Sequence, residues 1–220
     1  MARTRIRPEP PRIPDPDLPD HFTPAILTRS GEVSEARITL DPGNTDAAFA
    51  RMSECVVEAA SVQTLDVTGS ILSDVVIDTL SAAEVLARDA AWRTVVVRGG
   101  RIGTLDLSRA RCDGLILDGV RIDYLSAGGA TLRDVDVTGC RIGTLDLPGA
   151  RVERLRVDSS TVDEMDVREW QASDIDLRGA EVLSFTDIRM LRGVTLTADQ
   201  ATTHALALAA SLGLDVRTDS

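Results

Sequence analysis

Apolar residues recur at a fixed interval of five along most of this chain. Every fifth residue from Met52 to Val182 is apolar, and so is the residue two places earlier, from Ala50 to Ala180, except at Ser70, Gly100 and Ser160. An α-helix cannot use this spacing, because a step of five residues advances about 500° and spreads the side chains over several faces. A straight strand cannot use it either, since five is odd and alternation would put successive blocks on opposite faces. The pattern predicts a chain that turns a corner in every block of five residues.

The seven residues RIGTLDL occur twice, at Arg101–Leu107 and at Arg141–Leu147. Four right-angled corners, one in each block, close a square coil of four blocks, so the shift between the two copies equals two coils. A glycine column returns at the interval of one coil, at Gly99, Gly119, Gly139 and Gly179, and is broken by Ser159. Such a column is expected where one corner needs a positive φ. The sequence therefore predicts a coil that repeats after every fourth block.

The five-residue blocks LDLPG, VDVTG, IDLRG and ARVER resemble the repeats of pentapeptide-repeat proteins, whose consensus is A-[D/N]-L-x-x. The resemblance covers about residues 50–184. It implies an all-β solenoid, a right-handed quadrilateral β-helix of about seven 20-residue coils with a C-terminal helix. The chain departs from the family in three ways. Val dominates the second inward column, where the family prefers Leu or Phe, and Asn never fills the polar slot. Leu, Met165 or Trp170 often stands where the family prefers Ala.

The sequence divides into four segments. Residues 1–21 are predicted to form a Pro-rich extended arm, with six prolines between Pro8 and Pro19, because proline fixes φ and lacks a donor. Residues 22–49 are predicted to be N-terminal cap strands, 50–187 the pentapeptide-repeat β-helix, and 188–220 a last strand, a helix and a tail. Two interpretations of the arm stay open. It is a disordered tail, or its arginines contact the rod's acidic faces or a partner, and these arginines are Arg3, Arg5, Arg7 and Arg12.

The C-terminal segment carries a helix signal. Thr197 to Gln200 forms a capping box, and the Ala and Leu run that follows predicts a helix over about residues 198–212. In some gyrase-binding pentapeptide-repeat proteins the C-terminal segment forms a dimer, so the resemblance implies a homodimer through this helix. A helix folded over the last coil as a cap is equally compatible with the sequence.

One stretch inside the repeat has a second interpretation. Ser81 to Trp92 also begins with a capping box and is rich in strong helix formers, so it could be a helix that interrupts the rod. The five-residue frame crosses this stretch with no residue gained or lost, which favours a regular coil.

Charge and composition narrow the class of function. The net charge of −11 predicts that the protein does not bind nucleic acid directly, because phosphates would repel it. No apolar run is long enough for a membrane span and no signal peptide is seen, so we expect no membrane partner and a cytoplasmic location. Cys55, Cys112 and Cys140 lie at wide spacing in the inward columns, and are expected to be buried and inert.

No pattern in the chain predicts catalysis. His21 and His204 have no Cys or carboxylate neighbours at metal-ligand spacing, and the sequence holds no phosphate-binding loop or nucleophile motif. We therefore predict that the protein is not an enzyme, with no catalytic residue, no metal site and no cofactor.

Two hypotheses of function follow. The first is a protein-binding scaffold that presents the faces of the rod to an unidentified protein partner. The second comes from the resemblance: some pentapeptide-repeat proteins imitate duplex DNA, bind DNA gyrase, and inhibit it or protect it from quinolone antibiotics. By that resemblance the contact residues would be acids on one face, here Asp66, Asp106, Asp146 and Asp166. The same column is also consistent with a solvated ladder of carboxylates balanced by neighbouring arginines.

Overall fold

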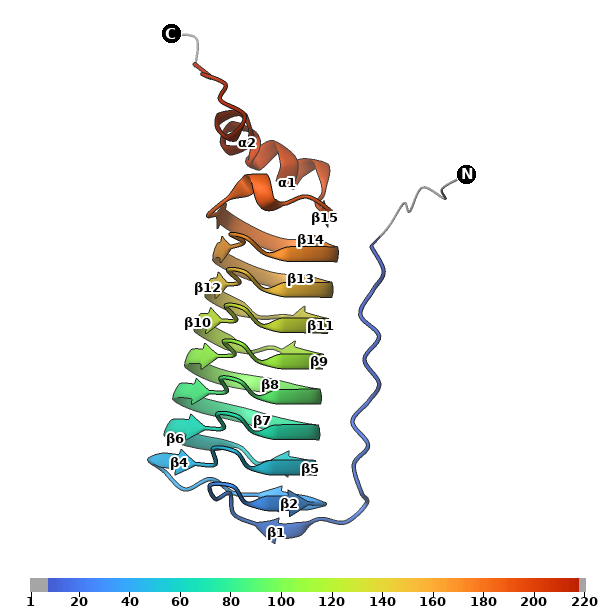
Figure 1. Cartoon of the computed structure of the whole chain (residues 1–220), viewed down its shortest axis with the longest axis vertical. Coiled ribbons are helices and arrows are strands. Elements are labelled where there is room, and N and C mark those ends of the chain that lie inside the picture. The colour runs from blue at the N-terminus through green and yellow to red at the C-terminus, as the bar shows by residue number, and fades with distance from the viewer. Residues whose placement is uncertain (1–7, 218–220) are drawn as a thin grey trace.

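The chain folds into a rod of stacked coils. The computed structural model describes residues 8–217, and Figure 1 shows the strands one above another between β1 and β14. The strands are β1 Thr23–Ala25, β2 Glu32–Ser34, β3 Ala36–Ile38, β4 Asn44–Asp46, β5 Arg51–Val57, β6 Ala60–Asp66, β7 Ile71–Leu86, β8 Ala91–Asp106, β9 Arg111–Asp118, β10 Arg121–Ser126, β11 Thr131–Thr138, β12 Arg141–Asp146, β13 Arg151–Asp166, β14 Gln171–Phe185 and β15 Val194–Thr195. The helices are the 3-10 turn η1 Ile188–Met190, α1 Ala198–Thr203 and α2 Ala205–Ser211.

Successive coils pair as parallel strands, and each residue lies beside the one four blocks further along the chain. Ile122 of β10 lies beside Ile102 of β8 on one side and Ile142 of β12 on the other, so the two RIGTLDL segments stand two coils apart in one ladder. All the strands join one sheet that winds around the rod. The predicted all-β solenoid is confirmed: the fold is a parallel-sheet β-solenoid of about eight turns with a short helical C-terminal end.

The rod has one more coil than the sequence predicts. The apolar columns start at residue 50, yet β2, β3 and β4 already follow the path of the coil above them. Asn44 pairs with Thr64 at the regular shift of four blocks, but Glu32 pairs with Arg51, which is one residue short of that shift. The missing residue puts this coil out of the five-residue frame, which is why the pattern does not include it.

The core is a stack of apolar layers inside the coils. Of the column from Met52 to Val182, every residue is buried except Ala172, which is half-buried. Both inward columns belong to one continuous cluster along the rod. The four blocks of a coil thus form four outer faces, which we number first to fourth from the blocks that begin at Ala50, Cys55, Ala60 and Leu65.

Three of the four corners use left-handed backbone. The corner after the second face has positive φ at Gly99, Gly119 and Gly139, as the glycine column predicts, but not at Gly179. Side chains other than glycine adopt the same conformation elsewhere in these corner columns, and the examples are Asp74, Thr79, Asp89, Thr94, Arg109, Asp134, Ser159, Glu169 and Asp174. Position in the coil, rather than glycine content, therefore sets the backbone conformation at the corners.

The helical interpretation of residues 81–92 is wrong. Strand β7 continues through this stretch to Leu86, a turn follows, and β8 begins at Ala91. Ala82, Ala87 and Trp92 all point into the core and are buried. Packing between neighbouring coils overrides the helix propensity of the segment.

The N-terminal arm lies along the rod. From residue 8 to residue 22 it runs beside the stacked strands in the opposite direction to the growth of the coils, and it contains no strand or helix of its own before β1 (Figure 1). The interpretation of the arm as a disordered tail is wrong for these residues, which contact the rod over several coils. Arg3, Arg5 and Arg7 lie outside the described residues.

The C-terminal end covers the last coil. The capping box at Thr197 and Gln200 is present, and the predicted helix is divided at His204 into α1 and α2. The side chain of Gln200 also donates to the carbonyl oxygens of Leu177 at 2.7 Å and of Ala180 at 2.6 Å. These bonds fix α1 against the end of the rod. Within residues 8–217 no helix has the length and apolar character that a membrane crossing requires.

Candidate functional site

The four acids proposed as contact residues do share one column on the fourth face. Strand register places Asp146 between Ser126 and Asp166, and Asp106 between Leu86 and Ser126. We call this column, with Asp66 at its lower end, the acidic ladder. Neighbouring rungs of a sheet are about 4.8 Å apart, so acids in adjacent rungs repel unless they are neutralised.

Most of the ladder carboxylates hold the corner of the coil. Asp66, Asp106 and Asp166 each accept a hydrogen bond from the backbone N–H two residues further on, at 2.9, 3.0 and 3.0 Å. This side-chain-to-backbone bond is a standard way for Asp to stabilise a turn. These carboxylates therefore have a structural role, whatever else they bind.

Asp146 differs because Pro148 stands two residues after it and has no N–H to donate. Its carboxylate instead accepts a hydrogen bond from the Tyr124 hydroxyl, at 2.9 Å, across the ladder. The upper neighbour Asp166 is only 5% exposed, and Arg168 donates to both of its oxygens. The bonds from Arg168 lower the pKa of Asp166, against the opposing effect of burial. Two of the four ladder carboxylates, Asp106 and Asp166, are thus paired with an arginine, whereas the hydrogen bonds described for Asp66 and Asp146 come from neutral donors.

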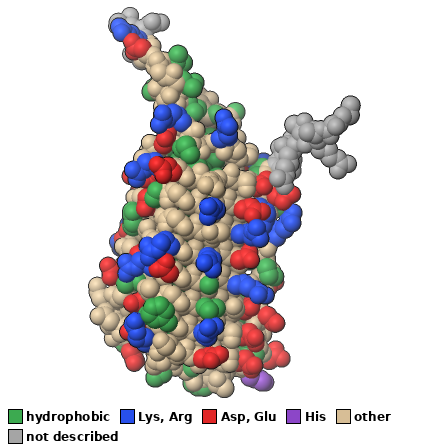
Figure 2. Space-filling view, in the orientation of Figure 1, with side chains coloured by type: hydrophobic (Ala, Val, Ile, Leu, Met, Phe, Trp, Pro, Cys, Tyr) green, Lys and Arg blue, Asp and Glu red, His purple; other side chains and the backbone are tan. Residues whose placement is uncertain are grey.

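Opposite charges are also paired on all four faces. The pairs, from first to fourth face, are Arg133–Glu153 at 3.0 Å, Arg156–Asp136 at 2.5 Å, Arg101–Asp123 at 2.9 Å and Arg88–Asp106 at 3.4 Å. Most of them join side chains in neighbouring coils. Figure 2 shows acidic and basic side chains intermixed along the visible side of the rod. The surface is net negative but locally balanced.

The second face carries an apolar stripe on its outside, which the sequence analysis missed. Val56, Val76, Val96 and Ile116 occupy one outward column, and the three valines are only 9%, 3% and 3% exposed. They form a small cluster separate from the core, and Leu18 and Phe22 of the arm pack against it. The signal was in the sequence: this outward column is apolar in four successive coils and charged in the next three.

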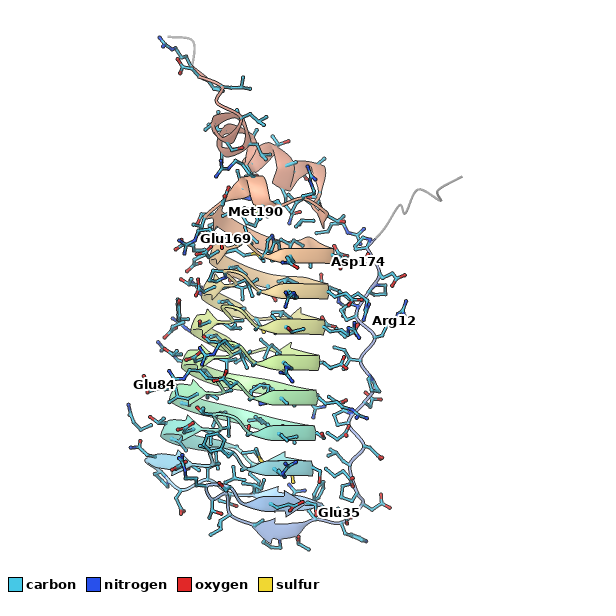
Figure 3. The ribbon with its side chains drawn as sticks, in the orientation of Figure 1. Arg12, Glu35, Glu84, Glu169, Asp174 and Met190 are labelled. Carbon is cyan, nitrogen blue, oxygen red and sulfur yellow. The ribbon has the colours of Figure 1, made fainter. Side chains whose placement is uncertain are left out.

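The corner beside this stripe binds the arm's backbone. Asp74, Asp134 and Asp174 accept hydrogen bonds from the N–H groups of Asp17, Arg12 and Glu9, at 3.3, 2.8 and 3.0 Å. We call the apolar stripe and these three carboxylates together the arm-binding face. In Figure 3 Arg12 and Asp174 lie where the arm meets the rod.

Asp134 is the most constrained of these carboxylates. Its oxygens accept from the Arg154 guanidinium at 2.6 and 2.8 Å as well as from the arm, and only 8% of its side chain is exposed. The hydrogen bonds from Arg154 lower the pKa of Asp134, although burial acts in the opposite direction. A fixed, charged acceptor is thus available to the arm at this rung.

The cysteines and histidines lie where the sequence indicated. Cys55, Cys112 and Cys140 are buried free thiols, and burial raises the pKa of Cys112 to about 12. His204 is buried against Phe185, with ring centroids 5.0 Å apart, while His21 is exposed. Over residues 8–217 no three His, Cys, Asp or Glu side chains come together as a metal site would require.

Comparison with known proteins identifies no family. No family model matches the chain, and no curated protein matches it. Among solved structures the chain is similar to QnrB1, a plasmid-mediated fluoroquinolone resistance protein, at 16% sequence identity. The match covers 86% of this chain and 99% of that one, with a TM-score of 0.34. The assignment of the fold rests on this chain's own strand register.

Proposed function

We propose that this protein is a non-enzymatic scaffold of the cytoplasm that binds a protein partner on the flat faces of its rod. The observation that supports a scaffold best is the pairing of opposite charges on every face, described above. A surface of this kind favours a partner that matches its shape and its mixed polar groups over one that responds only to negative charge.

Photo-crosslinking in the host cell tests this proposal. A photoreactive amino acid is placed in turn at Thr131, Thr161 and Ser126, outward positions on the first, third and fourth faces. We expect one face to give a discrete crosslinked protein band, and to give it again when irradiation is repeated in a cell lysate at 0.5 M salt. Core position Val137 serves as the matched control, because its side chain is buried and cannot reach a partner. No face-specific band above this control would contradict the proposal.

A second candidate function is the DNA mimic that binds DNA gyrase, favoured by the net charge of −11 and by the ladder Asp66, Asp106, Asp146 and Asp166. Because much of this ladder is bonded within the rod, we expect no inhibition in a gyrase supercoiling assay and no protection from a quinolone at tens of micromolar protein. A variant with all four acids changed to Asn is assayed in parallel. Inhibition that the variant loses, and that falls steeply with salt, would establish the mimic instead.

The C-terminal helices predict a homodimer, whether the protein is a scaffold or a DNA mimic. Leu206 is 67% exposed and Leu212 76% exposed, and Leu214 and Val216 beyond them are also exposed. Exposed apolar side chains that form a contiguous patch usually mark a contact, and we expect a second copy of the chain to cover these four. We expect the chain to elute as a dimer, and Leu206→Asp with Leu212→Asp to elute as a monomer, by size exclusion with light scattering. Exposed Leu183→Asp on the rod is the control, and a wild-type monomer at high concentration would contradict the prediction.

A further inference from the structure

The arm matches the rod in its repeat length. Glu9 and Arg12 are three residues apart and bind Asp174 and Asp134, which are two coils apart. Three residues of a polyproline II chain advance about 9.3 Å, and two rungs of a β-sheet advance about 9.6 Å. The next bonded pair is Asp17 with Asp74. From Arg12 to Asp17 the arm advances five residues, and from Asp134 to Asp74 the rod descends three coils, so the two lengths still agree approximately.

The prolines of the arm give it this conformation in advance. Pro8, Pro11 and Pro14 follow one another at steps of three residues, and Pro16 and Pro19 repeat the step. Three residues make one turn of polyproline II. Every third residue of such a chain therefore faces the rod. An extended segment that is already stiff loses little conformational entropy on binding.

Apolar side chains of the arm fit specific places on the second face and at the corner before it. Leu18 and Phe22 pack on the valine stripe, and the Arg37 guanidinium lies 5.0 Å from the centre of the Phe22 ring. In a coil nearer the C-terminal end, a Cβ on Gly114 would come within 3.3 Å of the Ile13 side chain. Because glycine has no Cβ, this position leaves room for Ile13. The arm-binding face thus combines apolar sites with side-chain carboxylates, three and two coils apart, that accept hydrogen bonds from the arm's backbone N–H groups.

The arm contacts the rod through side chains and not through a ladder of backbone hydrogen bonds. Between residues 8 and 22 it adds no strand to the sheet, and its backbone N–H groups bond to the side-chain carboxylates described above, of which Asp74 makes a bond exposed to solvent. Arg12, Pro14, Asp15 and Asp17 remain exposed. Segments with few buried contacts open at low free-energy cost while the rest of the fold stays intact.

We propose that the arm-binding face is a recognition site for proline-rich, extended peptide segments of a partner protein, and that the arm is its built-in, displaceable ligand. This inference deepens the proposed scaffold function and rests on it. A partner segment must supply a polyproline II backbone with N–H groups three residues apart and apolar side chains for the valine stripe. While the arm is docked, it keeps the stripe covered and competes with the partner.

The test uses the full-length protein and a fluorescent synthetic peptide of residues 8–22. In the wild type the tethered arm has a high effective concentration and competes with the peptide. The variant Ile13→Asp with Leu18→Asp weakens the arm and leaves the rod unchanged. We expect fluorescence anisotropy to show binding at least about tenfold tighter to this variant than to the wild type. Asp15→Ser, at an exposed arm position, is the matched control and should behave as the wild type.

Two further variants locate the site. Val76→Asp, added to the weakened arm, puts a charge under the peptide and should abolish binding, whereas Ile71→Asp, at the outward position of the first face in the same coil, should not. Circular dichroism confirms that each variant is folded. Absence of saturable binding to the folded weakened-arm variant, or equal binding with Val76→Asp, would overturn the inference.

Failure of the peptide-binding inference can be distinguished from failure of the scaffold function. If the peptide fails to bind but crosslinks persist on another face, the arm is a permanent strap and only the inference is wrong. If the peptide binds but no face gives a crosslink, the scaffold proposal fails for the exposed faces.

Discussion

Replacing Gly100 with alanine is expected to destabilise the rod by more than about 3 kcal/mol, near the upper end for a single substitution. Gly100 stands in an inward column beside Leu80 of the coil below, with φ of 87°. A Cβ there would lie 2.2 Å from the Leu80 carbonyl oxygen and 2.7 Å from its backbone nitrogen. These are backbone atoms of a paired strand, so they cannot rotate away as a side chain could. For a chain of this length the thermal midpoint should fall by at least about 6 °C, measured by circular dichroism.

Gly119→Ala is the matched control. Gly119 also has a positive φ, 64°, but an added Cβ would meet nothing within 4 Å. Thr79 and Ser159 adopt the same left-handed conformation in the same corner column, so the cost should be only about 1 kcal/mol of backbone strain. Equal destabilisation by the two substitutions would show that φ, and not the close approach to Leu80, makes Gly100 necessary.

The solenoid was predictable because its sequence signal is redundant. Each coil must place apolar residues inside its faces, so one requirement is repeated at every fifth residue over the length of the rod. Local propensity cannot cancel such a pattern. Ala82, Ala87 and Trp92 belong to a segment of strong helix formers, yet all three are buried inward residues of a coil. Only the N-terminal coil escaped the prediction, because its one-residue shift at Glu32 breaks the frame.

The docking of the arm was not predictable by the same argument. Prolines predict an extended chain, but they do not say what it lies against. The outward valines Val56, Val76 and Val96 show that something must cover the second face, and their cover comes from a segment that precedes the first coil in the sequence. A contact of this kind has no periodic signal that joins its two halves, so only the structure connects them.

For the acidic ladder the positions of the residues were predictable, but their hydrogen bonds were not. Its column was placed correctly, because the core fixes the register between one coil and the next. The hydrogen bonds of each acid depend on single atoms. Asp66 and Asp106 accept from the backbone N–H two residues further on, whereas Pro148, two residues after Asp146, has no N–H to donate. The sequence predicts where these carboxylates stand, and the hydrogen bonds determine which of their oxygens remain available to a partner.

Trp92 gives the second large expected effect. It is 2% exposed in an inward column, with Leu72 in the coil below and Cys112 in the coil above. Trp92→Ala leaves a cavity that these neighbours cannot fill, and should cost about 3–5 kcal/mol. The indole Nε1 is buried with no hydrogen-bond partner among the described residues. Trp92→Phe therefore removes an unsatisfied donor, whose burial costs about 1–3 kcal/mol, and this gain offsets the lost volume. Urea unfolding should place Trp92→Phe within about 1 kcal/mol of the wild type.

Trp170 provides the comparison that separates volume from hydrogen bonding. It is also buried, but its Nε1 donates to the carbonyl oxygen of Met190 at 2.9 Å and so ties the last coil to the turn η1. Trp170→Phe removes the same volume and leaves that carbonyl without its donor. We expect it to destabilise the rod more than Trp92→Phe does. Trp170→Phe removes a hydrogen bond that is made, whereas Trp92→Phe removes a donor that has no partner. An equal or larger loss from Trp92→Phe would mean that the Trp92 indole nitrogen has a partner, such as a buried water, in solution.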